Sequence, residues 1–466
     1  MKTLQDLLRS VSSLSQPKLW KSCAALIEEE NCHLRRLITK EGVSIYGVNT
    51  LVGHRDGEYV DASSSALLQE EVLRTHTIGK PPYYSDYAAR CITYAKLYAW
   101  SAGHSGVSPA LFNAVVEIAT SRVFLPNIPT GHSYSSGDVV PAAHWARDIL
   151  SVAKEKYQYD AEPGEVMALI NGSFVQLGYA ASLVEKIRKC WSLFIVSSAI
   201  VNVGAKANTS NLYFFSTAER SWALKSVQYI DSISNTSRNS KHTQDPVSIR
   251  AIPQVVEALC STIEEFMREI NYLLFKPSGN PLFNVDIDFP ISQSSFLCPV
   301  LTVKTEGVVE SILFSMWSMV GRVNHWLSGN VEDIPKDGSS SDLILGLIQH
   351  PKIMMAELES ARMNYGRRVF ASGSLTSYGT EDLWTNGLVT LAQLDQLLDS
   401  FLQSCAREIY IAAYLRKHHD IAALRGFELL DYCSECTSVE ETMESIDRYI
   451  SDGNLNDVYN IFPIKI

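Results

Sequence analysis

The chain has 466 residues, and 40 Lys and Arg against 51 Asp and Glu give it a formal net charge of -11. With 46% hydrophobic and 20% charged residues, its composition excludes a largely disordered chain. The basic residues are scattered, without the clusters that bind a phosphate backbone, so we expect no nucleic-acid partner.

The sequence predicts a cytoplasmic protein without a membrane segment. Residues 1–20 contain no uninterrupted apolar stretch of the signal-peptide kind, and no run of about 18 apolar residues follows. Nine dispersed cysteines, an odd number, are typical of reduced thiols. Cys433 and Cys436 form a C-x-x-C pair without a second pair at zinc spacing, so we expect no metal site.

The predicted elements are long helices separated by segments rich in turn residues and hydroxyls. Apolar residues recur at helical spacing in three runs, 180–195, 256–274 and 391–409. The segments expected as loops are 46–56, 126–138, 232–250, 276–295 and 372–382. Because strand-type alternation is rare, the predicted fold class is all-α, with a core of long packed helices. We expect three parts: an N-terminal part over 1–175, a helix bundle over 176–410 and a C-terminal helical tail over 411–466.

The segment 131–146, GHSYSSGDVVPAAHWA, contains a candidate internal electrophile. Glycine tolerates the backbone angles that bring its amide nitrogen onto a carbonyl two residues back. Closure of Ser135, Ser136 and Gly137 into a five-membered ring, with loss of two waters, would turn the Ser136 side chain into an electrophilic methylidene carbon. Asp138 would then cap the next helix. Ser-Gly pairs are far more often plain turns, so the tripeptide alone assigns no function.

This segment resembles the aromatic amino acid ammonia-lyase and aminomutase family, which includes histidine ammonia-lyase. The family's prosthetic group, 4-methylideneimidazol-5-one (MIO), forms from Ala-Ser-Gly within G-S-x-G-A-S-G-D-L-A-P-L-A-H. Ser135 replaces the usual Ala but keeps the backbone carbonyl that the ring needs. Further segments match family patterns in the same order: SIYGVNTLVG (44–53), LQEEVLRTHTIGK (68–80), AGHSGVSP (102–109), ALINGS (168–173), QDPVSIRAIPQV (244–255), GNPLF (279–283) and GTED (379–382).

The resemblance implies a fold, a cofactor and an assembly. The fold would be the long-helix bundle of the histidine and phenylalanine ammonia-lyases. The chain would form a homotetramer with active sites built from three subunits and would act on an α-amino acid. MIO would form autocatalytically from Ser135, Ser136 and Gly137, without an external cofactor.

The resemblance also implies residue roles. Tyr46 matches the family's catalytic base; its phenol, with an ordinary pKa near 10, needs a lowered pKa or a neighbouring charge to act near neutral pH. Asn171 matches a residue that contacts the ring and the substrate, although a structural Asn in a turn fits nearly as well. Gln244 and Arg250 match a polar pair around the substrate, where the guanidinium would hold the carboxylate through two hydrogen bonds.

Two residues bear on the choice of substrate. His76 follows Thr75, and in the family a Ser-His pair at this place accompanies histidine as substrate. Glu381 also resembles the histidine enzymes, in which this carboxylate would bind an imidazole or act as a second base. Together they favour a polar, nitrogen-bearing side chain over a benzene ring.

Departures from the family pattern leave alternatives open. Val247 stands where the family has a supporting tyrosine and cannot donate a hydrogen bond. Leu51 and Val52 replace the Gly-Phe of the tyrosine loop, which should stiffen it. The sequence around Phe296 also departs from the family pattern. Beside an ammonia-lyase, a 2,3-aminomutase that makes a β-amino acid and a non-catalytic paralogue therefore remain alternatives.

Overall fold

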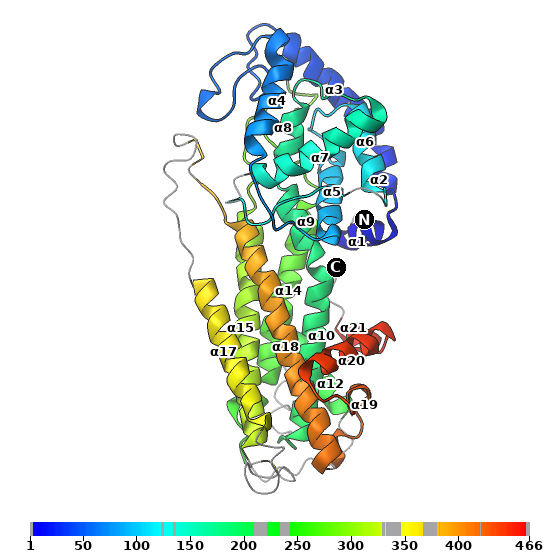
Figure 1. Cartoon of the computed structure of the whole chain (residues 1–466), viewed down its shortest axis with the longest axis vertical. Coiled ribbons are helices and arrows are strands. Elements are labelled where there is room, and N and C mark those ends of the chain that lie inside the picture. Colours follow the sequence, from blue (N-terminus) through cyan, green and yellow to red (C-terminus); the bar gives the residue numbers. More distant parts are fainter. Residues whose placement is uncertain are drawn as a thin grey trace.

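Helices account for the regular structure of the computed structural model (Figure 1). The described residues are 3–122, 125–133, 137–208, 221–233, 243–328, 331, 346–366, 380–381, 383–419 and 421–462. Within these ranges no sheet forms; the strand-like pairings are isolated antiparallel bridges, Thr50–Tyr59, Tyr83–Pro129 and Leu282–Ile291. The predicted all-α class is confirmed.

The N-terminal part of the chain, through Ile170, is a head of shorter helices at the upper end of Figure 1. Its helices are α1 (Leu4–Ser13), α2 (Lys18–Ser22), α3 (Ala24–Thr39), α4 (Ser65–His76), α5 (Asp86–Ser101), α6 (Pro109–Ala119), α7 (Val139–Tyr157) and α8 (Glu165–Ile170). Local signals start two of them. Ser85 caps α5 by accepting from the amide of Ala88, and Ser108 caps α6 with Pro109 in its first turn.

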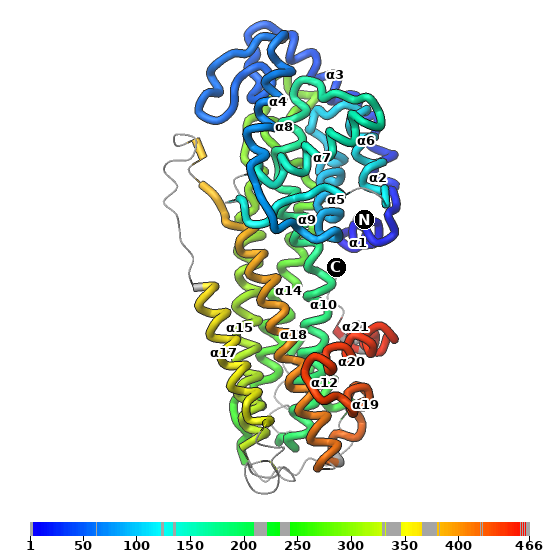
Figure 2. Tube along the Cα trace, in the orientation of Figure 1, coloured from blue at the N-terminus to red at the C-terminus, as the bar shows by residue number. Residues whose placement is uncertain are grey.

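Long helices run away from the head and form the bundle, as the trace in Figure 2 also shows. They are α9 (Phe174–Ser182), α10 (Val184–Gly204), α12 (Ser221–Ile233), α14 (Ile252–Leu273), α15 (Pro299–Leu327), α17 (Gln349–Gly366) and α18 (Gly387–His419), with the short α13 (Val247–Arg250) before α14. The three runs of helical spacing fall in α9–α10, α14 and α18. The last helices, α19 (Glu428–Tyr432), α20 (Val439–Ser451) and α21 (Asn456–Ile461), pack along the side of the bundle.

A buried ion pair joins three helices of the bundle. Arg322 of α15 donates from Nε and Nη2 to the two carboxylate oxygens of Glu408 on α18, at 2.5 and 2.6 Å, and from Nη1 to Ser198 Oγ of α10 at 2.8 Å. Both charged side chains have no exposed surface. Such a pair contributes to stability only when its hydrogen bonds are well made, as they are here.

One apolar stretch is long enough, by composition alone, to cross a bilayer. It is Glu165–Gly204, which covers α8 to α10, and 89% of its most apolar window is buried inside the protein. Burial of that kind is also typical of a core helix.

The three-part division of the chain stays a prediction.

Candidate active site

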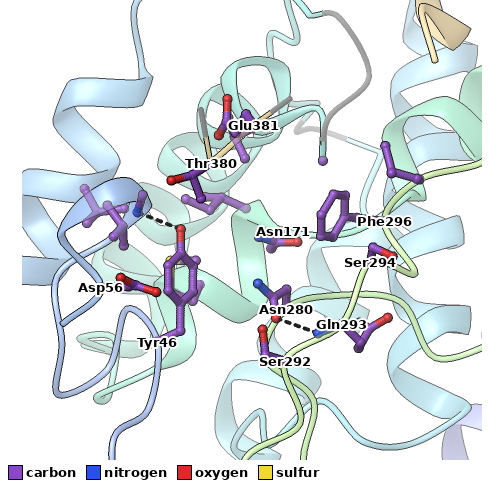
Figure 3. A pocket seen from close by; sticks show the side chains of 18 of the residues that line it. Tyr46, Asp56, Asn171, Asn280, Ser292, Gln293, Ser294, Phe296, Thr380 and Glu381 are labelled. Atoms are coloured by element: carbon purple, nitrogen blue, oxygen red, sulfur yellow. Dashed lines mark hydrogen bonds between the residues drawn. The ribbon is translucent and has the colours of Figure 1, made fainter. Parts of the chain in front are cut away.

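A cavity of about 830 Å³ lies where the head meets the upper end of the bundle. Five of the residues singled out in the sequence line it: Tyr46, His76, Gly137, Asn171 and Glu381. They come from five separate segments of the chain, namely the loop after α3, the end of α4, the start of α7, the end of α8 and the segment before α18. Figure 3 shows Tyr46, Asn171 and Glu381 among them. The fold therefore brings together residues that are up to 335 positions apart.

The loop that carries Tyr46 is fastened by its own residues. Asn49 bonds back to two residues that precede Tyr46: its Oδ1 accepts from the backbone amide of Ile45, and its Nδ2 donates to the backbone carbonyl of Val43. Gly47 has a φ of +65°, and a Cβ there would lie 2.5 Å from the side chain of Met167, so only glycine fits. The phenol oxygen of Tyr46 accepts a hydrogen bond from the backbone amide of Gly53 at 2.9 Å.

The electrostatics of Tyr46 within one chain oppose its use as a base. Burial is the largest cause that raises the pKa of the phenol, and the carboxylates of Glu381 and Asp56 raise it further, against the amide of Gly53. The described residues that line the cavity include no Lys or Arg. The lowered pKa expected from the sequence is therefore not found within the single chain, because the phenol is buried and the charged groups that act on it are carboxylates rather than cations.

His76 and Glu381 place hydrogen-bond acceptors at the cavity. His76 is the last residue of α4, and its Nδ1 lies 2.7 Å from the carbonyl oxygen of Val72. Because a carbonyl only accepts, Nδ1 carries the proton, and Nε2 of the neutral ring is left as an acceptor. In Figure 3 Glu381 and Thr380 lie on one side of the cavity and Asn280 and Ser292 on the other. The cavity thus suits a ligand that donates hydrogen bonds.

Of the three residues expected to form the prosthetic group, Ser135 and Ser136 lie outside the described residues. Gly137 has a φ of +82°, in the left-handed region that favours glycine. Asp138, also left-handed, occupies the N-cap position of α7, but its side chain makes no capping hydrogen bond, so that prediction was wrong. Its backbone lacks the extended geometry of a side-chain cap. Its carboxylate instead accepts from Ser133 Oγ at 2.6 Å.

Asn171 directs an unused polar atom to the site. It follows the last residue of α8 and is 8% exposed, and its Oδ1 is buried without a hydrogen-bond partner. A buried acceptor left unpaired costs about 1–3 kcal/mol, so a donor from a bound ligand would be favourable there. The helix N-terminus at Val139, which lines the same cavity, favours negative charge there. The left-handed Gly137 fits the ring closure that the sequence implies, and the unpartnered Oδ1 of Asn171 can accept from the amine of a substrate.

Sequence reasoning missed one wall of the cavity. It is formed by the segment between α14 and α15, with Asn280, Ser292, Gln293, Ser294 and Phe296 (Figure 3). The backbone amide of Gln293 donates to Asn280 Oδ1 at 3.2 Å and closes the segment on itself. The match of GNPLF at 279–283 was the signal for this wall. Asp56 also lines the cavity, and no sequence motif pointed to it.

Gln244 and Arg250 do not reach the cavity of their own chain. With its amide oriented toward the guanidinium, Gln244 Oε1 accepts from Arg250 Nη1 at 2.8 Å. Arg250 ends α13, and the neighbouring Ser248 packs against Gly321 of α15. Gly321 lies about six turns, roughly 33 Å, from the start of α15 beside the cavity.

A sequence model of the family described as aromatic amino acid lyase matches residues 3–420. The chain belongs to this family. Histidine ammonia-lyase of Paracidovorax citrulli is 25% identical over 324 residues, which cover 63% of this chain and 62% of that protein. The MIO-dependent tyrosine 2,3-aminomutase of Streptomyces globisporus is 27% identical over 291 residues, 53% of this chain and 54% of that one. This member of the family thus matches less than two thirds of the length of these curated relatives.

Solved structures show the same fold over nearly the whole chain. Tyrosine aminomutase from Streptomyces globisporus superposes with a TM-score of 0.83 at 18% identity, covering 98% of this chain and 97% of its own. Phenylalanine aminomutase from Pantoea agglomerans superposes with a TM-score of 0.84 at 19% identity, covering 96% of this chain and 97% of its own. Histidine ammonia-lyase from Trypanosoma cruzi superposes with a TM-score of 0.78 at 17% identity, covering 100% of this chain and 94% of its own. At these identities the likeness is one of fold, and the predicted bundle type is confirmed.

Proposed function

We propose that this protein is an MIO-dependent ammonia-lyase that converts an α-amino acid with a polar, histidine-like side chain into an α,β-unsaturated acid and ammonia. The observation that carries the proposal is the cavity itself, in which Tyr46, the unpartnered Oδ1 of Asn171 and Gly137 meet. The family supports it, since the names of the relatives include both ammonia-lyases and aminomutases.

In the proposed reaction this chain's residues bind the substrate and move a proton. The ring formed from Ser135, Ser136 and Gly137 would supply an electrophilic carbon for the substrate's amine. Tyr46 removes the β-proton as the C–N bond breaks, and the Gly53 amide at 2.9 Å stabilises the phenolate before that step. Asn171 Oδ1 accepts a hydrogen bond from the amine of the substrate, and the N-terminus of α7 stabilises negative charge.

A histidine-like substrate follows from the acceptors at the cavity. An imidazole N–H could donate to the carboxylate of Glu381 or to Nε2 of His76. A phenyl ring has no donor and would leave buried polar groups unpaired, which strongly reduces binding. The carboxylates of Glu381 and Asp56 also favour a side chain that carries positive charge.

The proposed site needs a second chain, and this supports the predicted homotetramer. The lining residues described in one chain offer no cation for the substrate carboxylate, whereas Arg250 lies far along the bundle. We infer that Arg250 of a neighbouring subunit completes the cavity, with Gln244 beside it. An exposed apolar stripe on α15 supports such packing, since Val303, Phe314 and Trp317 are each more than half exposed. Val247 next to Arg250 is 64% exposed and would lie in the same interface.

Intact mass tests the prosthetic group directly. We expect the purified protein to weigh two water molecules less than its sequence dictates and to absorb in the near ultraviolet. Ser136→Ala should restore the encoded mass and abolish turnover, because the methylidene carbon comes from that side chain. A wild-type chain of full encoded mass would refute the proposed chemistry and favour the non-catalytic paralogue.

Subunit mixing tests the shared site. Tyr46→Phe and Arg250→Ala chains should each be inactive alone but active when co-expressed, with about one quarter of sites intact on random mixing. Pairing Tyr46→Phe with Asn171→Ala is the matched control. Both residues line one chain's cavity, so that pair should recover nothing. No recovery in the test pair would exclude an Arg250 contributed by another subunit. Recovery in the control would instead show that Tyr46 and Asn171 of one site come from different chains.

An aminomutase is the second candidate. The MIO-dependent tyrosine 2,3-aminomutase among the relatives and the two aminomutase folds favour it. Product analysis by mass separates the two activities, because a mutase returns a β-amino acid of the same mass as its substrate and a lyase releases ammonia.

A further inference from the structure

Lys96 of α5 is a fully buried lysine beneath the cavity. Its side chain is 1% exposed and makes no ion pair with any described residue. Nζ donates to the backbone carbonyl of Asn171 at 2.8 Å and lies 4.3 and 5.3 Å from the ring centres of Phe174 and Trp100. Burial lowers the pKa of Lys96 well below its ordinary value. Burying a lysine without a counter-charge costs folding free energy, so its hydrogen bond to Asn171 needs a physical explanation.

The carbonyl that Lys96 binds stands at the end of a helix. Asn171 is the C-cap of α8, where the last carbonyls have no partner within the helix. The backbone amide of Asn171 is already fixed, since it donates to the backbone carbonyl of Met167 at 3.0 Å. On the far side, Ser173 donates its amide to Ser278 Oγ at 2.7 Å. Lys96 therefore supplies the one donor that this buried carbonyl receives among the described hydrogen bonds.

Gly172 makes this restraint important for the direction of Asn171. Its φ is +133°, and without a Cβ it imposes little steric restraint on the peptide between residues 171 and 172. A rotation of that peptide would turn Asn171 at its α-carbon and move the unpartnered Oδ1 away from the cavity. The hydrogen bond from Lys96 opposes this rotation.

We propose that Lys96 is a positioning residue, which holds the backbone carbonyl of Asn171 so that the side-chain amide of Asn171 faces the substrate. The proposal rests on the proposed function for its kinetic consequence, but its structural part does not. It also explains why a lysine interrupts the otherwise largely apolar segment ITYAKLYAW of α5.

Lys96→Met should lower kcat by at least tenfold with a much smaller change in KM. In the Asn171→Ala background the same substitution should change kcat less than twofold, because a residue acting through Asn171 loses its effect once that side chain is gone. Lys96→Arg, which keeps a donor, should recover part of the activity. The matched control is Tyr94→Phe on the same helix, which removes another buried donor to a backbone carbonyl, that of Ser15 at 3.2 Å, away from the cavity. It should stay within twofold of wild type.

Hydrogen exchange gives a readout that does not need activity. The backbone amides of Gly172 and Ser173 should exchange faster in Lys96→Met than in wild type. In Tyr94→Phe their exchange rates should be unchanged. If Lys96→Met does not fold, Lys96→Gln serves in both measurements. Unchanged exchange at these amides, or additive kinetic effects with Asn171→Ala, would overturn the positioning role. A wild-type chain without the prosthetic group would overturn the proposed function alone, and exchange would still decide the role of Lys96.

Discussion

Tyr46→Phe should reduce kcat/KM by about two to four orders of magnitude, the range for loss of a general base, and leave the prosthetic group in place. Phenylalanine keeps the ring but removes the oxygen that accepts from Gly53 at 2.9 Å. Turnover and intact mass measure the two effects separately. Tyr59→Phe is the control, because it removes a phenol from an exposed position in the same loop, 64% exposed. Near-wild-type turnover in Tyr46→Phe would remove Tyr46 from its role.

The pH dependence should carry the same signature. Because burial and the nearby carboxylates raise the pKa of Tyr46, the phenolate is populated only as the pH rises. The kcat/KM of wild type should therefore increase through the alkaline range, and arrival of a guanidinium from another subunit would move that increase to lower pH. The residual activity of Tyr46→Phe should lack this increase.

Glu408→Gln should destabilise the protein by about 3–5 kcal/mol, because it leaves the guanidinium of Arg322 buried without a counter-charge. Chemical denaturation at fixed protein concentration measures the change. Glu71→Gln, the same substitution in the exposed pair with Arg74, should have little effect. The double replacement Arg322→Met with Glu408→Leu should return much of the stability, since a buried ion pair is often replaced by apolar groups without loss. Equal stability of Glu408→Gln and wild type would show that Arg322 finds another partner.

The sequence predicted the convergence of Tyr46, His76, Asn171 and Glu381 on one site, because family patterns fix residue types that a shared reaction needs. The fold class followed from the spacing of apolar residues in α10, α14 and α18. Local chemistry was less predictable. Asp138 stands at an N-cap position, yet its left-handed backbone prevents the capping bond that its residue type favours.

Long-range features had no signal in a single sequence. Lys96 could have been a solvated side chain, and only the packing of α5 against its neighbours, α9 above all, buries it. Arg322 and Glu408 are separated by 86 residues, so nothing local pairs them. The raised pKa of Tyr46 depends first on burial and then on the carboxylates of Glu381 and Asp56, and the fold creates this setting. Motifs report chemistry, whereas burial and charge balance arise from tertiary and quaternary packing.

Helix α15 acts as a spacer of fixed length between the two functional ends of each subunit. It has 29 residues, about 43 Å, with the cavity at one end and the Arg250 region toward the other. A rigid rod cannot fold back, so under the proposed arrangement a newly made chain remains inert toward free amino acids until it finds its partners. Specific activity should then fall on dilution below the dissociation constant of the assembly, and the enzyme's concentration itself would govern when deamination begins.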